Sequence, residues 1–191
     1  MVHGDARQQL LEGAIDHVGV HGIADLSLRS LAAALGTSHR MLIHHFGSKE
    51  GLWVAIVREV ERRQQAVLAD VVPLADATYE TAMWAWWRHI SDPVLWPNAA
   101  LFFEVYGQAL HGKPPANELL DGIVDTWVEG AAAMAIARGL SPMDAPAYAR
   151  LGVAVVRGLL LDLLATKDRE GVDAAFGSWV RLTAPAFERP C

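Results

Sequence analysis

Residues 26–49, LSLRSLAAALGTSHRMLIHHFGSK, hold the side chains of this chain that are best suited to contact a polyanion. The segment contains no Asp or Glu, although the whole chain has a net charge of −6. Arg29, Arg40 and Lys49 are spread along it, with Ser, Thr and His between them. Because phosphate contact needs a local basic surface, any nucleic-acid contact must be confined to a small patch near the N-terminus.

The same segment contains residues that typically begin and end two short helices joined by a tight turn. Ser27 is a typical N-cap, and Leu26 and Leu31 are spaced as a hydrophobic staple around it. Gly36 can adopt the positive φ of a sharp reversal. Such a pair of helices, the second one polar and free of acids, suits insertion into the major groove of DNA.

The second short helix is expected to start at Thr37 or Ser38 and to end at Gly47, with Ser48 capping the helix that follows. Its inward side chains are predicted to be Met41, Leu42 and Phe46. The following helix, predicted to continue to Pro73, becomes increasingly charged and is interpreted as a connector between two domains.

Residues 26–52 resemble the N-terminal signature of TetR-type (tetracycline-repressor-like) transcriptional regulators. The matching positions are Ser27, Leu31-Ala32, Leu35-Gly36, Ser38, Leu42, His45-Phe46 and Lys49-Glu50. The resemblance implies an all-α homodimer with a three-helix DNA-binding head and a larger helical ligand-binding body. It also implies that Lys49 contacts phosphate.

This chain departs from the family pattern at several positions. Arg40 stands where a small residue is usual, Met41 where Thr is frequent, and Ile43 where an aromatic residue, commonly Tyr, contacts the DNA backbone. Arg40 can pair with guanine, or compensate with a charged backbone contact. The residues predicted to contact DNA are Ser27, Arg29, Thr37, Ser38, His39, Arg40, Ile43, His44, His45 and Lys49.

The rest of the chain has helical periodicity and no strand-like alternation. Further helices are predicted at about 76–91, 97–110, 116–138, 143–165 and 169–187. We therefore expect an all-α fold with a helix-turn-helix domain at 1–50 and a ligand-binding and dimerisation domain at 51–191, of which 51–72 is the connector.

Composition limits the alternatives. The chain has 191 residues, 52% of them hydrophobic, and its single cysteine, Cys191, excludes an intrachain disulfide. Neither a secretory signal nor a membrane span is apparent, so we expect a cytoplasmic protein without membrane contact. His17 and His21 have a metal-binding spacing, but a solvated face is the favoured interpretation, and no metal or cofactor is expected.

Aromatic residues concentrate between positions 79 and 127. A helical body can use them to line an apolar pocket, or simply to fill its core. The pocket candidates are Met83, Trp87, Phe103, Tyr106, Trp127 and Met134. A small, neutral apolar or aromatic effector would fit such a lining.

The helix around residues 149–168 is apolar on nearly all sides, which indicates burial against a partner helix. The predicted dimer interface comprises Gly152, Val155, Gly158, Leu159, Trp179, Val180 and Thr183. A two-fold dimer would read a near-palindromic operator.

These features together favour a ligand-responsive transcriptional repressor. The alternatives are a helical small-molecule carrier or enzyme that uses the aromatic cavity, and a module whose helix-turn-helix binds protein. Against an enzyme, the sequence has no nucleophile elbow, P-loop, dinucleotide glycine pattern or H-E-x-x-H motif.

Overall fold

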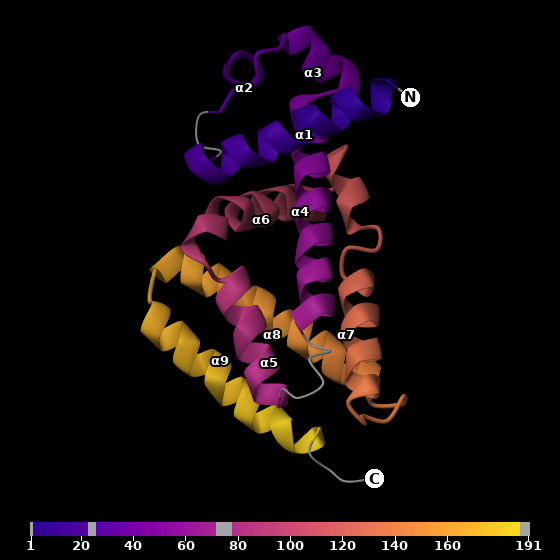
Figure 1. Ribbon diagram of the computed structural model, residues 1–191, viewed down its shortest axis with the longest axis vertical. Coiled ribbons are helices and arrows are strands. Elements are labelled where there is room, and N and C mark those ends of the chain that lie inside the picture. The colour runs from indigo at the N-terminus through magenta and orange to yellow at the C-terminus, as the bar shows by residue number, and fades with distance from the viewer. Residues whose placement is uncertain (1, 23–25, 72–77, 188–191) are drawn as a thin grey trace. The chain divides into compact units, whose positions relative to one another are not determined.

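The computed structural model describes residues 2–22, 26–71 and 78–187, and within these ranges the chain forms helices and no strands (Figure 1). The α-helices are α1 (Val2–His21), α2 (Leu28–Ala34), α3 (His39–Phe46), α4 (Lys49–Val71), α5 (Tyr79–Ile90), α6 (Trp96–Leu110), α7 (Asp125–Ala137), α8 (Ala145–Thr166) and α9 (Arg169–Thr183). Short 3₁₀ helices cover Pro93–Leu95, Ala116–Leu120 and Ala184–Ala186. The predicted all-α fold is confirmed. None of the described helices combines the length and hydropathy that a bilayer span requires.

Contacts divide the chain into two units. The first comprises residues 1–62 and 93–121. In it, α2 packs on both α1 and α3, while α6 packs on α1. Leu31 and Leu42 are among its fully buried side chains. The first unit thus includes α6, which lies far beyond residue 50 in the chain. The predicted domain boundary near residue 50 stays a prediction.

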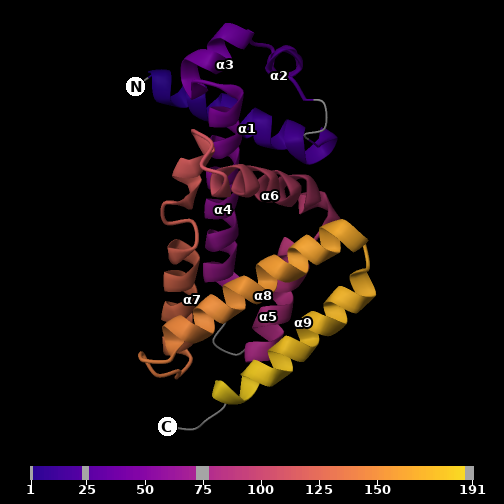
Figure 2. The ribbon, with the colours of Figure 1, turned by 180° about the vertical axis from the view of Figure 1, so that it is seen from behind.

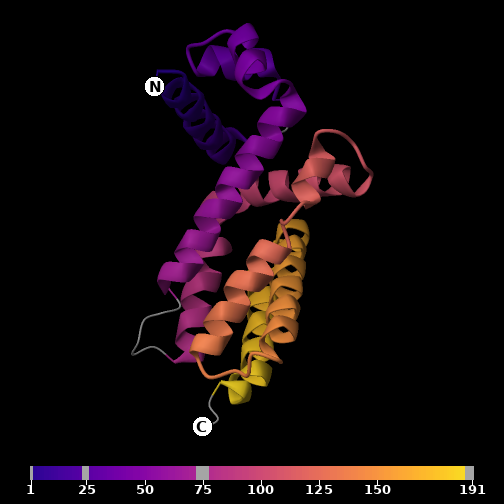
Figure 3. The same ribbon diagram turned by 90° about the vertical axis from the view of Figure 1, so that its right-hand side faces the viewer.

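The second unit comprises residues 63–92 and 122–191. Helix α8 lies between α7 and α9 in contact with both, and α5 packs on α9 (Figures 2 and 3). Trp87 on α5 stacks on Phe176 of α9, with ring centroids 4.7 Å apart, and its indole nitrogen donates to Asp173 Oδ1 at 2.7 Å. This pair ties α5 to α9.

One predicted helix is wrong. The sequence favoured a continuous helix over 116–138, whereas the chain forms a 3₁₀ turn at Ala116–Leu120 and starts α7 only at Asp125. The break comes at Gly122, whose φ of +78° lies in the left-handed region that interrupts a right-handed helix. The other four predicted helices of the body correspond to α5, α6, α8 and α9 within a few residues.

Tyr79, at the start of α5, joins that helix to the end of α9 and the residues after it. Its ring stacks on Phe187 with centroids 4.2 Å apart, and its hydroxyl lies 2.9 Å from Thr183 Oγ1. Thr183 Oγ1 donates to the backbone oxygens of Trp179 and Val180 in its own helix. The Tyr79 hydroxyl is therefore the donor in its bond to Thr183. Burial raises the pKa of this phenol.

We predict that Tyr79 makes the protein less stable at alkaline pH. Because the native state retains a proton that the unfolded chain loses above a tyrosine pKa of about 10, the free energy of unfolding must fall as pH rises through that region. Urea unfolding between pH 8 and pH 11 measures this effect. Tyr79→Phe should show a shallower decline than wild type, and Tyr148→Phe is the control. Equal declines in wild type and Tyr79→Phe would contradict the assignment.

Candidate nucleic-acid interface and effector cavity

The start of α2 is fixed by a reciprocal cap. Ser27 Oγ accepts from the backbone N–H of Ser30 at 3.0 Å, and Ser30 Oγ accepts from the backbone N–H of Ser27 at 3.1 Å. The prediction of Ser27 as N-cap is confirmed. Such caps satisfy amide donors that the first helical turn leaves free. Arg29 is exposed in that turn.

The turn between α2 and α3 is built as the sequence indicates. Gly36 has a φ of +63°, and the Thr37 amide closes the end of α2 by donating to Ala32 O at 2.9 Å. Ser38 then caps α3, its Oγ accepting from the Met41 amide at 3.2 Å. Its hydroxyl proton therefore remains able to bond an acceptor such as a phosphate oxygen.

Helix α3 buries two side chains one turn apart. Leu42 is 1% exposed and Phe46 9% exposed, whereas the Met41 side chain is 43% exposed. The prediction that Met41 points inward is thus wrong. In a helix Met41 lies about 100° around the axis from Leu42 and about 140° from Phe46, so it falls to the side of the face that these two residues bury. Met41 instead joins the outer face.

The outer face of α3 and its approach are polar and basic. Ser38, His39, Arg40 and His44 are exposed, while Thr37, Ile43 and His45 are half-buried. No acidic side chain occurs between residues 26 and 49. The predicted DNA contacts that are accessible are therefore Ser27, Arg29, Ser38, His39, Arg40 and His44, and the exposed Met41 adds an apolar group on the outer face of α3. Their role in binding DNA stays a prediction.

Two cation–π contacts flank this surface. The Lys49 ammonium lies 5.6 Å from the centre of the Trp53 ring, and the Arg7 guanidinium lies 5.0 Å from that of Phe46. Helix α4 begins at Lys49, and Ser48 Oγ accepts from the Gly51 amide at 2.9 Å. The lysine is half-buried, so its stem is held near the protein while its charge sits at the start of a helix.

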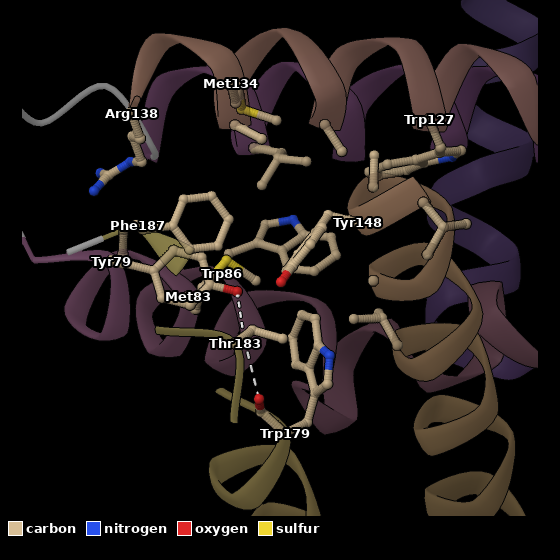
Figure 4. A pocket seen from close by; sticks show the side chains of 18 residues that line it. Tyr79, Met83, Trp86, Trp127, Met134, Arg138, Tyr148, Trp179, Thr183 and Phe187 are labelled. Carbon is tan, nitrogen blue, oxygen red and sulfur yellow. Dashed lines mark hydrogen bonds between the residues drawn. The ribbon is translucent and has the colours of Figure 1, made fainter. Parts of the chain in front are cut away.

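A cavity of about 100 Å³ lies in the second unit (Figure 4). It is enclosed by α5, α7, α8 and α9, with Leu68 contributed by α4. Its larger lining side chains are Tyr79, Met83, Trp86, Trp127, Met134, Arg138, Tyr148, Trp179 and Phe187. Among the lining residues described here, Arg138 is the single charged side chain.

Half of the predicted pocket set lines this cavity. Met83, Trp127 and Met134 do so, whereas Trp87, Phe103 and Tyr106 do not. Trp87 is fully buried between α5 and α9, and the other two lie on α6, which belongs to the first unit. Sequence reasoning missed Tyr79, Trp86, Tyr148, Trp179 and Phe187. For α5 the signal was present, since Tyr79, Met83 and Trp86 follow the i, i+4, i+7 spacing of one helix face.

The predicted dimer residues divide between surface and interior. Gly158 is exposed, and Val155 and Leu159 are half-buried. Val180 and Thr183 are buried within the second unit and present little surface to another chain. Gly152 and Trp179 both line the cavity, and a Cβ at Gly152 would lie 3.3 Å from the Trp179 ring.

Of the predicted dimer residues, Gly158 alone belongs to the exposed apolar stripe of α8. Its members follow alternating spacings of three and four residues, and all are exposed: Leu151, Ala154, Gly158, Leu161 and Ala165. This is the spacing by which one helix packs along another. On α9, Ala175 and Leu182 are also exposed.

The amino-terminal segment matches a known family by sequence. Residues 10–56 match the sequence profile described as "Bacterial regulatory proteins, tetR family". The chain is similar to the HTH-type transcriptional repressor AcnR of Corynebacterium glutamicum, with 38% identity over 66 residues. That alignment covers 35% of this chain and 35% of AcnR, so the chain matches about a third of the length of this relative.

Solved structures match over nearly the whole chain. A transcriptional regulator from Rhodococcus sp. Rha1 shares 21% identity at a TM-score of 0.76, covering 97% of this chain and 100% of that one. BioQ with its double-stranded DNA operator shares 22% identity at a TM-score of 0.61, covering 97% and 99%. These likenesses show the fold. Residues 10–56 are thus similar in sequence to the tetR family of bacterial regulatory proteins, and the fold of the chain is similar to that of the solved regulators.

Proposed function

We propose that this protein is a ligand-responsive transcriptional repressor that binds a near-palindromic operator as a homodimer and is released by a small apolar or aromatic molecule. The observation that carries the proposal is the outer face of α3. It is exposed, basic and free of carboxylates in a chain whose net charge is −6. The relative AcnR, named as a transcriptional repressor, supports the same activity.

Base reading is assigned to the first turns of α3. Arg40 is exposed there, and a guanidinium can donate two hydrogen bonds to guanine O6 and N7. His39 and His44 are exposed beside it, and Met41 supplies an apolar surface for a thymine methyl group. Arg29 and the amides at the start of α2 suit the phosphate backbone, because helix N-termini attract anions.

Dimerisation is assigned to α8 and α9. The apolar stripe of α8 is exposed in the single chain, and burying it against a second copy removes apolar surface from water. A two-fold dimer places two recognition helices about 34–36 Å apart, one turn of duplex. It also doubles a basic patch that is small in each chain.

Release by ligand is assigned to α4. This one helix begins at Lys49 beside α3 and carries Leu68, which lines the cavity. A ligand that binds one arrangement of the cavity more tightly than another can shift the position of α4. Operator binding and ligand binding then oppose each other by a coupling free energy.

Selection of bound duplexes from a random pool tests the proposal as a whole. The expected product is a duplex with two related half-sites about one helical turn apart. Small apolar and aromatic molecules are then added to the complex to find those that release it. Failure to retain any duplex at low salt would exclude the proposed function and favour a carrier that uses the cavity alone.

Arg40→Ala is predicted to relax sequence preference. Loss of a bidentate contact to guanine removes about 1–3 kcal/mol of discrimination at one position of each half-site. Competition binding of the selected duplex and its single-base variants measures the change. Arg181→Ala, which removes an exposed arginine on α9, is the control and should leave the preference intact. Unchanged discrimination in Arg40→Ala would refute the assigned role.

Lys49→Ala is predicted to weaken all duplexes alike. One phosphate contact fewer should reduce the slope of log affinity against log salt concentration by about 1 per chain. Titrations of selected and random duplexes over a range of salt concentrations measure this slope. Lys113→Ala, at an exposed position, is the matched control. A sequence-dependent loss in Lys49→Ala would contradict a backbone contact.

Leu161→Glu is predicted to separate the dimer. The side chain is 51% exposed within the α8 stripe, and burying an unpaired carboxylate there is costly. Sedimentation equilibrium should give a monomer with at least tenfold weaker operator binding, because one head alone loses the avidity of two. Met143→Glu, at an 86% exposed position before α8, should remain a dimer. A dimeric Leu161→Glu would place the interface elsewhere.

A further inference from the structure

Two of the residues that line the cavity carry buried indole N–H groups. The ring nitrogens of Trp86 and Trp179 are buried, and neither meets an acceptor among the described residues. Both residues line the cavity, one from α5 and the other from α9 (Figure 4). A buried donor left without an acceptor costs about 1–3 kcal/mol, so native proteins seldom retain one without a reason.

The other polar groups of the cavity are engaged or lie near its edge. The Tyr79 hydroxyl donates to Thr183, whose own proton goes to the backbone of α9. Tyr148 is 38% exposed. The two indoles are therefore the buried donors that an occupant of this cavity can satisfy, and an occupant that does so must carry a hydrogen-bond acceptor.

The remaining lining defines the body of the occupant. It consists of aromatic, methionine and small aliphatic side chains, without a carboxylate among the lining residues. A cation would have no counter-charge there. An anion would have to shed its hydration for one arginine, Arg138, which already interacts electrostatically with Tyr79. An uncharged molecule avoids both costs.

The size of the cavity limits the occupant further. Its volume is about 100 Å³. An apolar protein cavity of about 150 Å³ holds benzene, whereas pockets for drug-sized ligands measure about 300–1,000 Å³. The cavity is therefore smaller than one that holds benzene, so its occupant is at most a single ring with a short substituent, and binding such a ring must widen the space.

We infer that the effector is a compact, uncharged aromatic molecule whose carbonyl-type acceptor is bound by one of the two buried indole N–H groups, that of Trp86 or that of Trp179. This inference rests on the proposed function for its biological role, since the molecule is the one expected to release the operator. Its chemistry rests on the cavity alone.

Four one-ring probes test the inference by calorimetry on the full-length protein. Acetophenone carries a neutral carbonyl acceptor, and α-methylstyrene replaces that oxygen with a CH₂ group of similar shape. Benzoate and benzamidinium carry opposite charges. Acetophenone should bind about two- to tenfold more tightly than α-methylstyrene, the range expected for one net hydrogen bond. It should bind at least tenfold more tightly than either ion.

Variants then assign the preference to the indoles. The double variant Trp86→Phe/Trp179→Phe keeps aromatic rings but removes both N–H groups, so acetophenone should lose its advantage over α-methylstyrene. Trp84→Phe removes an indole outside the cavity lining and should keep the advantage. Circular dichroism checks that the variants fold. If the double variant does not fold, the comparison of the four probes on wild type decides.

The inference is overturned if no neutral probe binds, if acetophenone and α-methylstyrene bind equally to wild type, if an ion binds best, or if the preference survives in the folded double variant. An ordered water that permanently satisfies both indoles would give equal binding of the two neutral probes. Operator binding is measured separately. Retained operator binding without probe binding refutes only this inference, whereas probe binding without any operator binding refutes only the proposed function.

Discussion

Leu42 and Phe46 determine what the rest of the amino-terminal unit can do. They lie one helical turn apart on α3 and are almost fully buried, so they fix the rotation of a helix only two turns long. Every other side chain of α3 is thereby directed to the flanks or outward. The caps at Ser27 and Ser38 and the left-handed glycines at 36 and 47 set where the short helices start and stop. Were either apolar anchor lost, the exposed basic face would have no defined direction.

The second unit encloses an apolar cavity, so contacts outside the cavity must hold its surrounding helices in place. The indole of Trp87 is stacked on Phe176 and bonded to Asp173, while Tyr79 is stacked on Phe187 and bonded to Thr183. These aromatic contacts hold α5 against α9 on the side away from the cavity and at its edge. The neighbouring Trp86 and Trp179 then line the cavity, and their N–H groups meet no acceptor within the described part of the chain. Rigid surroundings of this kind favour recognition of a small ligand by few polar contacts.

Local signals in the sequence were sufficient to predict the short helices and turns of the DNA-binding head. Ser27, Gly36, Ser38 and Gly47 each act through their own backbone or the next turn, so residue type and spacing predict them. Met41 was misplaced because hydrophobicity alone assigned it to the core, whereas its position on the helix lies to the side of the face that Leu42 and Phe46 bury. The pocket was harder to predict. Trp86 and Trp87 are adjacent and equally apolar, so composition cannot tell which of them faces the cavity. The exclusion of Phe103 and Tyr106 depends on α6 packing against α1, a long-range contact without a periodic signature.

Methylation interference on the selected operator tests the central claim most directly, namely that α3 enters the major groove. Dimethyl sulfate modifies guanine N7 in the major groove and adenine N3 in the minor groove, which are separate recognition surfaces. The account predicts that methylated guanines in two half-sites, about 10 base pairs apart, prevent binding. Interference confined to adenine N3, or absent at every guanine, would contradict it.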